Sequence, residues 1–259
     1  SYYWLAGLLA ELGVVTVTYT LVAEEMPGYI SLTPGLALGA LMPGEYGKQP
    51  SATVIGPILQ DLGKLNDSGV LAGCLALQRV VLGGHSAGGT VALLNARADW
   101  FPGVCAAFSY GAHAGAATAL GYEQDSLFPL PSELPLLVLG GTRDGCIANS
   151  GARYGEAEGS ATRKVEQTFD QAISSNRGDC YLALVDGANH FSLAFPRDES
   201  TGRPFIDFPT TRPDPDLRQL LGVLIGQFVS AVTGRGDGAR DRLESLLERD
   251  ELIHRGARR

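Results

Sequence analysis

The amino-acid sequence predicts a single α/β domain built on a mostly parallel sheet, and three observations lead to this prediction. The chain has 259 residues, 45% of them apolar, which is enough for a substantial core. Short apolar runs alternate along it with longer helical patterns, as is typical of a parallel sheet covered by helices on both faces. Its 34 glycines and 14 prolines follow no fixed period, which excludes collagen and low-complexity disorder.

The expected elements follow from local patterns, starting with an amphipathic helix over residues 1–12. A glycine ends this helix, and the β-branched run 13–19 is predicted to form a buried strand. Residues 24–50 carry four prolines and several glycines, so we expect a long surface loop that flanks a site. Further helices are expected at 51–65, 87–98, 160–174 (a surface helix) and 216–232, and further strands at 79–82, 104–110, 136–139 and 181–185.

The α/β domain is expected to span residues 1–233. After a glycine-rich stretch, residues 234–259 are predicted to form a charged helix or tail. The apolar side chains of this segment fall on one stripe, which consists of Leu243, Leu246, Leu247 and Ile253. Its charged side chains are interpreted as a solvent-exposed face.

Charge and cysteine content restrict the class of protein. With 20 basic and 28 acidic residues the net charge is −8, so the surface should repel phosphate backbones, and we expect no nucleic-acid partner. No apolar run approaches the roughly 18 residues that a membrane span needs. The four cysteines are widely spaced and form no C-x-x-C pair, so they are expected to be reduced core thiols rather than disulfides. They require no oxidising compartment, and we lean toward a cytoplasmic protein.

A candidate nucleophile lies in the stretch Gly84-His85-Ser86-Ala87-Gly88, a match to G-x-S-x-G. A predicted strand comes directly before this motif and a predicted helix directly after it. A sharp strand-to-helix turn needs small residues around the serine, because the neighbouring chain passes close to it. The turn also puts the Ser86 hydroxyl near a helix N-terminus, where a developing anion is favoured. The alternative is an incidental glycine turn.

A serine hydroxyl needs a base, and His190 is the best placed of the four histidines. It follows the strand 181–185 by a short loop and so should lie at the same edge of the sheet as Ser86. His85 is expected to point away from Ser86, His113 to have a packing or substrate-side role, and His254 to lie in the tail. A plain surface-loop role for His190 is the alternative.

The base in turn needs a carboxylate, and Asp144 follows the strand 136–139 through a short loop. Asp186 is the rival acid, but it lies only four residues before His190, which leaves little room to fold its carboxylate back onto the ring. Either aspartate could instead be a plain loop cap. The favoured order along the chain is therefore Ser86, Asp144, His190.

This order and spacing resemble the α/β-hydrolase superfamily, and the details resemble its dienelactone hydrolase, chlorophyllase and cutinase-like polyester hydrolase branch. Besides the three residues, the aromatic pair Tyr3-Trp4 with residues 5–15 is similar to the helix and strand that follow the oxyanion loop in that branch. Residues 140–145, Gly-Gly-Thr-Arg-Asp-Gly, are similar to its acid loop. The resemblance covers most of residues 1–233.

The resemblance also exposes a departure. In the family, three strands and a loop precede the helix that begins this chain, and that loop supplies one of two oxyanion N–H donors. Only the Ala87 N–H can be carried over here, and the strand 13–19 would lack its usual neighbour beside 79–82. We therefore expect an amino-terminally truncated hydrolase domain, of low activity and stability by itself.

The leading hypothesis is a serine hydrolase that cleaves a small-molecule carboxylic ester without cofactor or metal. His190 would deprotonate Ser86, an acyl-enzyme would form, and water would then attack it. The apolar stretch 26–43 would form a wall for the acyl or alcohol group. Two alternatives stay open: hydrolysis of an amide or peptide bond, and an inactive binding module. The oligomeric state and the identity of the ester do not follow from the sequence.

Overall fold

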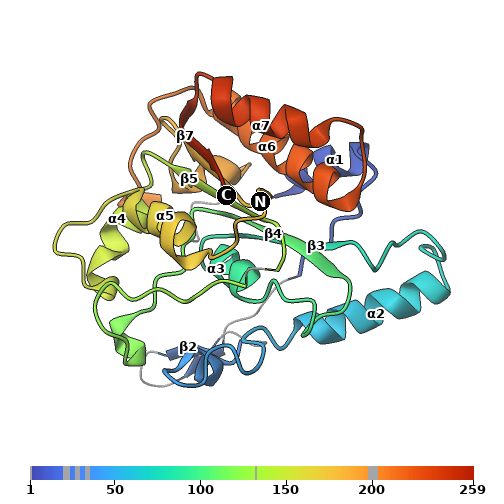
Figure 1. Ribbon diagram of the computed structural model, residues 1–259, viewed down its shortest axis with the longest axis horizontal. Helices are drawn as coiled ribbons and strands as arrows, with labels where there is room; N and C mark the ends of the chain where they lie inside the picture. Colours follow the sequence, from blue (N-terminus) through green and yellow to red (C-terminus); the bar gives the residue numbers. More distant parts are fainter. Residues whose placement is uncertain (1, 20–23, 27–29, 33–35, 132, 198–203) are drawn as a thin grey trace.

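The computed structural model describes residues 2–19, 24–26, 30–32, 36–131, 133–197 and 204–259. A five-stranded sheet runs through the molecule in the order β3-β4-β5-β6-β7 (Figure 1). Its strands are β3 (Val80–His85), β4 (Val104–Tyr110), β5 (Leu136–Gly141), β6 (Tyr181–Val185) and β7 (Ile253–Arg258). Strands β3 to β6 run parallel, and β7 pairs antiparallel with β6. The mostly parallel α/β fold predicted from the sequence is confirmed and is compatible with an α/β-hydrolase.

The inner strands form where the sequence is continuously apolar. Every residue of β5 and β6 is buried, because both faces of these strands are covered. β3 has β4 as its only partner among the described residues and is half-buried along most of its length. The candidate site residues discussed below follow the carboxyl ends of β3, β5 and β6, which lie at one edge of the sheet.

Helices cover both faces of the sheet. On one face lie α1 (Tyr3–Glu11), α6 (Asp214–Thr233) and α7 (Ala239–Arg249), which share a core with alternate residues of β4 to β6 (Figure 1). On the other face, α3 (Ala87–Leu94) and α5 (Arg163–Gln167) pack over the remaining alternate residues. The other helices are α2 (Ile55–Asp67), of which only Ile55 is buried, and α4 (Gly145–Ser150).

α6 is the longest described helix, and its sequence explains its limits. Pro215 stands in its first turn, where proline costs no hydrogen bond, and Gly234 ends it in the left-handed conformation at φ 68°. The apolar stripe predicted for this helix is buried against the sheet: Leu217, Leu220, Leu221, Leu224, Ile225 and Phe228 are all at most 6% exposed.

The buried strand predicted at residues 13–19 is wrong. Residues 14–19 adopt no regular structure, and the side chains of Val15, Val17 and Tyr19 are about half exposed, at 52%, 45% and 48%. β-branched residues favour an extended backbone, but a strand also needs a neighbour to hydrogen-bond with. No described strand pairs with this segment.

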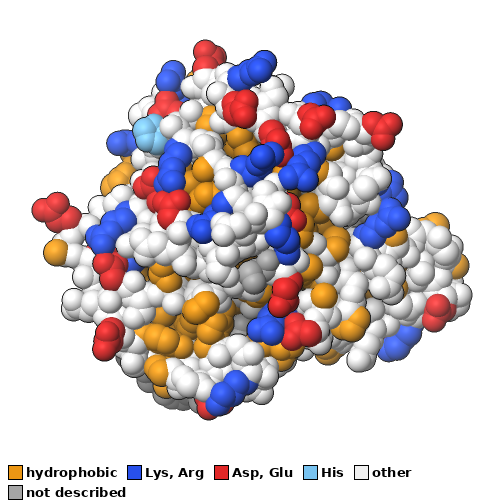
Figure 2. Space-filling model, viewed as in Figure 1, with side chains coloured by type: hydrophobic (Ala, Val, Ile, Leu, Met, Phe, Trp, Pro, Cys, Tyr) orange, Lys and Arg blue, Asp and Glu red, His pale blue; other side chains and the backbone are white. Residues whose placement is uncertain are grey.

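The charged C-terminal segment forms the predicted helix, α7, and then the strand β7, which was not predicted. Residues 239–249 bury Leu243 and Leu247 and expose most of their charges. β7 alternates half-buried and exposed residues along the outer edge of β6, so the end of the C-terminal segment joins the sheet of the domain. Acidic and basic side chains are interspersed over the face of the molecule in Figure 2, rather than gathered by sign.

Three further expectations are revised in part. In the 24–50 loop, Glu24–Met26 (β1) and Ile30–Leu32 (β2) form a small antiparallel ribbon, and a 3₁₀ turn follows at Leu38–Leu41. The surface helix predicted at 160–174 is shorter and has a buried face, since α5 continues as a π-helical turn, Thr168–Ala172, that buries Phe169. All four cysteines are free, as expected, but Cys74 is exposed and so is not a core thiol.

Candidate active site

Ser86 lies in a sharp turn between β3 and α3. Its backbone is at φ 56°, ψ −131°, and it is one of two non-glycine residues with positive φ in the described part of the chain. The Ser86 N–H donates to the carbonyl of Tyr110 at 2.9 Å, which ties the turn to the end of β4. A Cβ at Gly84 would come within 2.1 Å of the Gly88 carbonyl oxygen, so the turn requires glycine there. This geometry is that of a strained strand-to-helix elbow.

The Ala87 N–H lies at the open N-terminus of α3. Ala87 is the first residue of the helix and is exposed, and its N–H donates to no group among the described residues. It is therefore free to bind an anion that forms beside Ser86.

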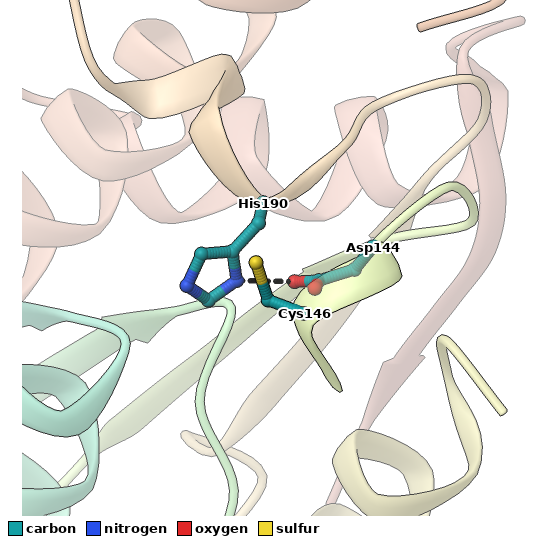
Figure 3. Close-up of side chains that lie close together, drawn as sticks. All are labelled: Asp144, Cys146 and His190. Carbon is teal, nitrogen blue, oxygen red and sulfur yellow. Dashed lines mark hydrogen bonds and ion pairs between the residues drawn. The ribbon is translucent and has the colours of Figure 1, made fainter. Parts of the chain in front are cut away.

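Asp144 and His190 form a buried pair at the ends of β5 and β6. His190 Nδ1 donates to Asp144 Oδ2 at 2.8 Å (Figure 3). His190 is 5% exposed and Asp144 is 0% exposed. The other carboxylate oxygen caps α4 by accepting the Ile147 N–H at 2.8 Å. Because the carboxylate holds the proton of Nδ1, the neutral ring presents Nε2 as its basic nitrogen.

The structure brings Asp144 and His190 together, but Ser86 is not hydrogen-bonded to the imidazole. Among the described residues, His190 Nε2 and Ser86 Oγ have no hydrogen-bond partner. Such a bond is often loose until substrate is bound. Gly111, at the end of β4, keeps the space beside the pair open: a Cβ there would lie 2.9 Å from His190 Nδ1 and 3.1 Å from Asp144 Oδ2.

His85 links the turn of Ser86 to the loop of His190, a contact that the sequence did not predict. Its Nε2–H donates to the His190 carbonyl at 2.8 Å, and its Nδ1 accepts the hydroxyl of Tyr2 at 2.7 Å. The two imidazole rings lie with their centroids 4.6 Å apart. Burial, followed by the proximity of His190, lowers the pKa of His85 to about 3, so its ring is neutral at physiological pH. His85 was expected to point away from Ser86; its ring contacts His190 and Tyr2 instead.

Hydrogen bonds from three further elements fix the loop 189–193. The Tyr110 hydroxyl donates to the carbonyl of Asn189, and the indole N–H of Trp4 donates to that of Leu193 at 2.9 Å. Asp207 accepts the N–H of Phe191 at 3.3 Å and that of Gly145 at 2.8 Å, and so joins the loops of His190 and Asp144. Burial is the main cause that raises the pKa of Asp207. No local pattern marks these residues, because their partners are distant in sequence.

The rival residues have other partners. Asp186 binds the guanidinium of Arg212 at 2.7 Å, away from the imidazole. His113 is buried, and its Nδ1 accepts the Gly115 N–H at 3.0 Å, which is the packing role expected for it. His254 is exposed on β7. His190 is thus the one histidine of the described chain that binds a buried carboxylate.

Cys146 lies beside the Asp144–His190 pair (Figure 3). It is the second residue of α4, it is half-buried, and its sulfur lies within 4.8 Å of a carboxylate oxygen of Asp144 and a ring nitrogen of His190. Burial, followed by the negative charges of Asp207 and Asp144, raises the pKa of this thiol to about 12. Cys146 is therefore a thiol at neutral pH and not a competing nucleophile.

The apolar wall expected from residues 26–43 lies partly outside the described residues, since 27–29 and 33–35 are not described. In the part that is described, Ala40 is buried and Leu38 and Met42 are partly exposed.

No protein-family model matches the chain, and a search of curated proteins found no significant match. Among the residues that the structure describes, no helix combines the length and the apolar character needed to cross a bilayer.

Proposed function

We propose that the protein is a cofactor-independent serine hydrolase of the α/β-hydrolase superfamily, which cleaves carboxylic esters through an acyl-enzyme. The observation that carries the proposal is the buried hydrogen bond between His190 and Asp144, located at the same sheet edge as the strained turn of Ser86. A carboxylate that holds one imidazole nitrogen, and so leaves the other as base, is the acid–base half of a serine hydrolase. The sequence resemblance favours the dienelactone hydrolase, chlorophyllase and polyester hydrolase branch.

In the acylation step, Ser86 Oγ attacks the ester carbonyl carbon while His190 Nε2 takes the hydroxyl proton. The resulting imidazolium is stabilised by its hydrogen bond to the carboxylate of Asp144. The Ala87 N–H donates to the oxyanion of the tetrahedral intermediate. Collapse of the intermediate breaks the bond to the alcohol oxygen, which leaves with the proton from Nε2.

Deacylation repeats these steps with water as the nucleophile. His190 Nε2 takes a proton from the water, which attacks the acyl carbon, and then returns the proton to Ser86 Oγ as the acid departs. The hydrogen bond from His85 holds the backbone of His190 during both steps, so the base keeps its position relative to Ser86.

Labelling with a fluorophosphonate probe tests the nucleophile. The wild-type chain should become labelled, and Ser86→Ala should not, since the probe reacts only with an activated serine. Ser68→Ala, at an exposed serine after α2, is the matched control and should label like wild type. An unlabelled wild-type chain that still folds would favour the inactive binding module, and a labelled Ser86→Ala would remove Ser86 from the mechanism.

A paired panel of esters and amides with the same acyl group tests the bond that is cleaved. We expect slow ester hydrolysis by this chain, since the Ala87 N–H is its one assigned oxyanion donor, and Ser86→Ala should lower it further by orders of magnitude. Amide hydrolysis at a rate comparable with that of the ester would instead favour the amide or peptide bond hydrolase.

A further inference from the structure

Cys146, Asp144 and His190 place three different metal-ligand atoms close together. A thiol sulfur, a carboxylate oxygen and a ring nitrogen all lie within 4.8 Å of one another, on the short segment 144–146 and the loop of His190 (Figure 3). We propose that these residues form an inhibitory site for a thiophilic divalent cation such as Zn²⁺. This inference rests on the proposed function for its consequence, the loss of hydrolysis, but not for the binding itself.

The donor set matches the preferences of zinc. Zn²⁺ binds cysteine sulfur at about 2.3 Å and histidine nitrogen or carboxylate oxygen at about 2.0–2.2 Å, in a tetrahedral arrangement. Ligand atoms around such an ion are therefore roughly 3–4 Å apart. The Nδ1 to Oδ2 separation is 2.8 Å, and the sulfur lies within 4.8 Å of a ring nitrogen of His190 and a carboxylate oxygen of Asp144, so side-chain shifts of about 1 Å would close the site. Three protein ligands leave the fourth position to water.

The surroundings hold the three ligands in place and favour a cation. Asp144 is fixed as the cap of α4, and His190 by the hydrogen bond from His85 to its carbonyl. Asp207 adds a second carboxylate nearby, since it accepts the N–H of Gly145, next to Cys146. Once the thiolate forms, it and the carboxylates of Asp144 and Asp207 are the negative groups of the site, and, among the described residues, Arg197 is the one cation that opposes them at the thiol. A divalent cation neutralises this excess.

Binding of the cation would stop hydrolysis because it changes which nitrogen of His190 carries the ring proton. The cation displaces the thiol proton to solvent and forms the bond to Cys146 sulfur. It also takes the lone pair of His190 Nδ1, so the proton now held between Nδ1 and Asp144 is lost there and Nε2 carries the ring proton instead. An imidazole with a protonated Nε2 cannot accept the proton of Ser86. The inhibited enzyme thus differs from the active one by one cation and one thiol proton.

The test is a titration with Cd²⁺, whose bond to a thiolate gives an ultraviolet charge-transfer band, and with Zn²⁺ in the ester assay. All variants carry Cys74→Ala, because the exposed Cys74 thiol would add its own absorption. We expect one Cd²⁺ per chain in this background and also with Ser86→Ala, which cannot hydrolyse ester. Cys146→Ala and His190→Ala should lose the band. Cys105→Ala, at a half-buried thiol on β4, is the matched control and should keep it.

In the ester assay, each variant is compared with its own rate in the presence of a chelator. Cys146→Ala should raise the Zn²⁺ concentration for half-inhibition by at least about tenfold, whereas Cys105→Ala should not. A band that persists in Cys146→Ala, or its absence from the Cys74→Ala parent, would overturn the inference even if esters are hydrolysed. A band without any esterase activity would overturn the proposed function and leave the metal site standing.

Discussion

At the scale of single residues, the site depends on side chains whose contribution is to hold another residue in place. His85 is the clearest case, because its ring lies between Tyr2 and the carbonyl of His190 and is neutral. Its Nε2–H donates to that carbonyl from the end of β3. In the proposed mechanism, His85 is therefore a positioning residue for His190 rather than a catalytic one.

Replacing His85 by phenylalanine or by glutamine tests this role. The glutamine amide would keep an N–H donor near the position of Nε2, whereas the phenylalanine ring would keep the shape of the side chain and lose the donor. We expect His85→Phe to lower kcat by ~10–100-fold with little change in KM, because a base displaced by about 1 Å transfers protons poorly. His85→Gln should recover most of the rate. Steady-state kinetics at several pH values measure both effects, with thermal unfolding run alongside.

The contrary result is specific. If His85→Phe and His85→Gln lose the same fraction of activity and the same stability, the histidine fills space and does not position the base.

The site residues that the sequence predicted share one property: each follows a strand of the parallel sheet, either directly or through a short loop. Ser86, Asp144 and His190 could be placed at one sheet edge because parallel strands end there. The roles of His85, Asp207 and Cys146 could not be assigned, since their partners are set by tertiary contacts between distant loops. A hydrogen bond between Ser86 and His190, which the proposed mechanism needs, is absent among the described residues.

At the scale of elements, α1 packs against α6 through a pair of glycines. A Cβ at Gly222 would lie 2.9 Å from side-chain atoms of both Leu8 and Trp4, and one at Gly226 would lie 3.0 Å from Leu12. The absence of side chains at these two positions lets the helices approach closely. Trp4, held in this way, donates to the loop of His190, so the packing of α1 also supports the site.

We therefore predict that Gly222→Val destabilises the protein by about 1–3 kcal/mol, because the added methyl groups overpack the contact. Gly7→Ala, on the exposed face of α1 with no atom within 4 Å of the new Cβ, is the control. It should stabilise the protein by about 0.5–1 kcal/mol through helix propensity. Urea unfolding measures both. Equal stability of Gly222→Val and wild type would mean that α1 is not held against α6 as described.

Strands could be predicted where the apolar run was continuous. They could be predicted less well where strand formation depends on whether a neighbouring strand is available for pairing. β4 and β6 were predicted with the observed limits, because their residues are buried whichever face they turn to. β7 has the sequence Ile-His-Arg-Gly-Ala-Arg, which contains no apolar run, and it forms because β6 offers a free edge. The run 13–19 is the reverse case: it is rich in β-branched residues but forms no strand, and no described strand pairs with it.

At the scale of the whole molecule, buried histidines make stability depend on pH. Burial lowers the pKa of His113 to about 4, whereas in the unfolded chain it is 6.5. Between these values the unfolded state binds more protons, so the free energy of unfolding falls as the pH is lowered through this window. Above about pH 6.5, His113 is neutral in both states, and the free energy of unfolding no longer depends on pH through this group. The slope from one such group reaches about 1.4 kcal/mol per pH unit, and His85, at about 3, adds to it.

Urea unfolding of wild type and His113→Asn across this window checks the prediction. The asparagine side chain would keep an acceptor near the position of Nδ1 for the Gly115 N–H but cannot be protonated, so the stability of this variant should fall less steeply. His254→Asn makes the same change at an exposed position and should follow the wild-type slope. Parallel curves for His113→Asn and wild type would show that His113 does not contribute.

The backbone of Ser86 has a consequence for evolution under selection for heat resistance. A serine at φ 56°, ψ −131° stores strain of about 1–3 kcal/mol, which a glycine would release. A glycine also lowers the free energy of unfolding by about 0.5–1 kcal/mol, because it makes the unfolded chain more flexible. Ser86→Gly should then melt no lower than wild type and up to several degrees higher, whereas Ser86→Ala, which retains a Cβ, should not gain. A search that rewards thermal stability alone would therefore discard the proposed nucleophile, and this position would stay serine only under selection for the proposed reaction.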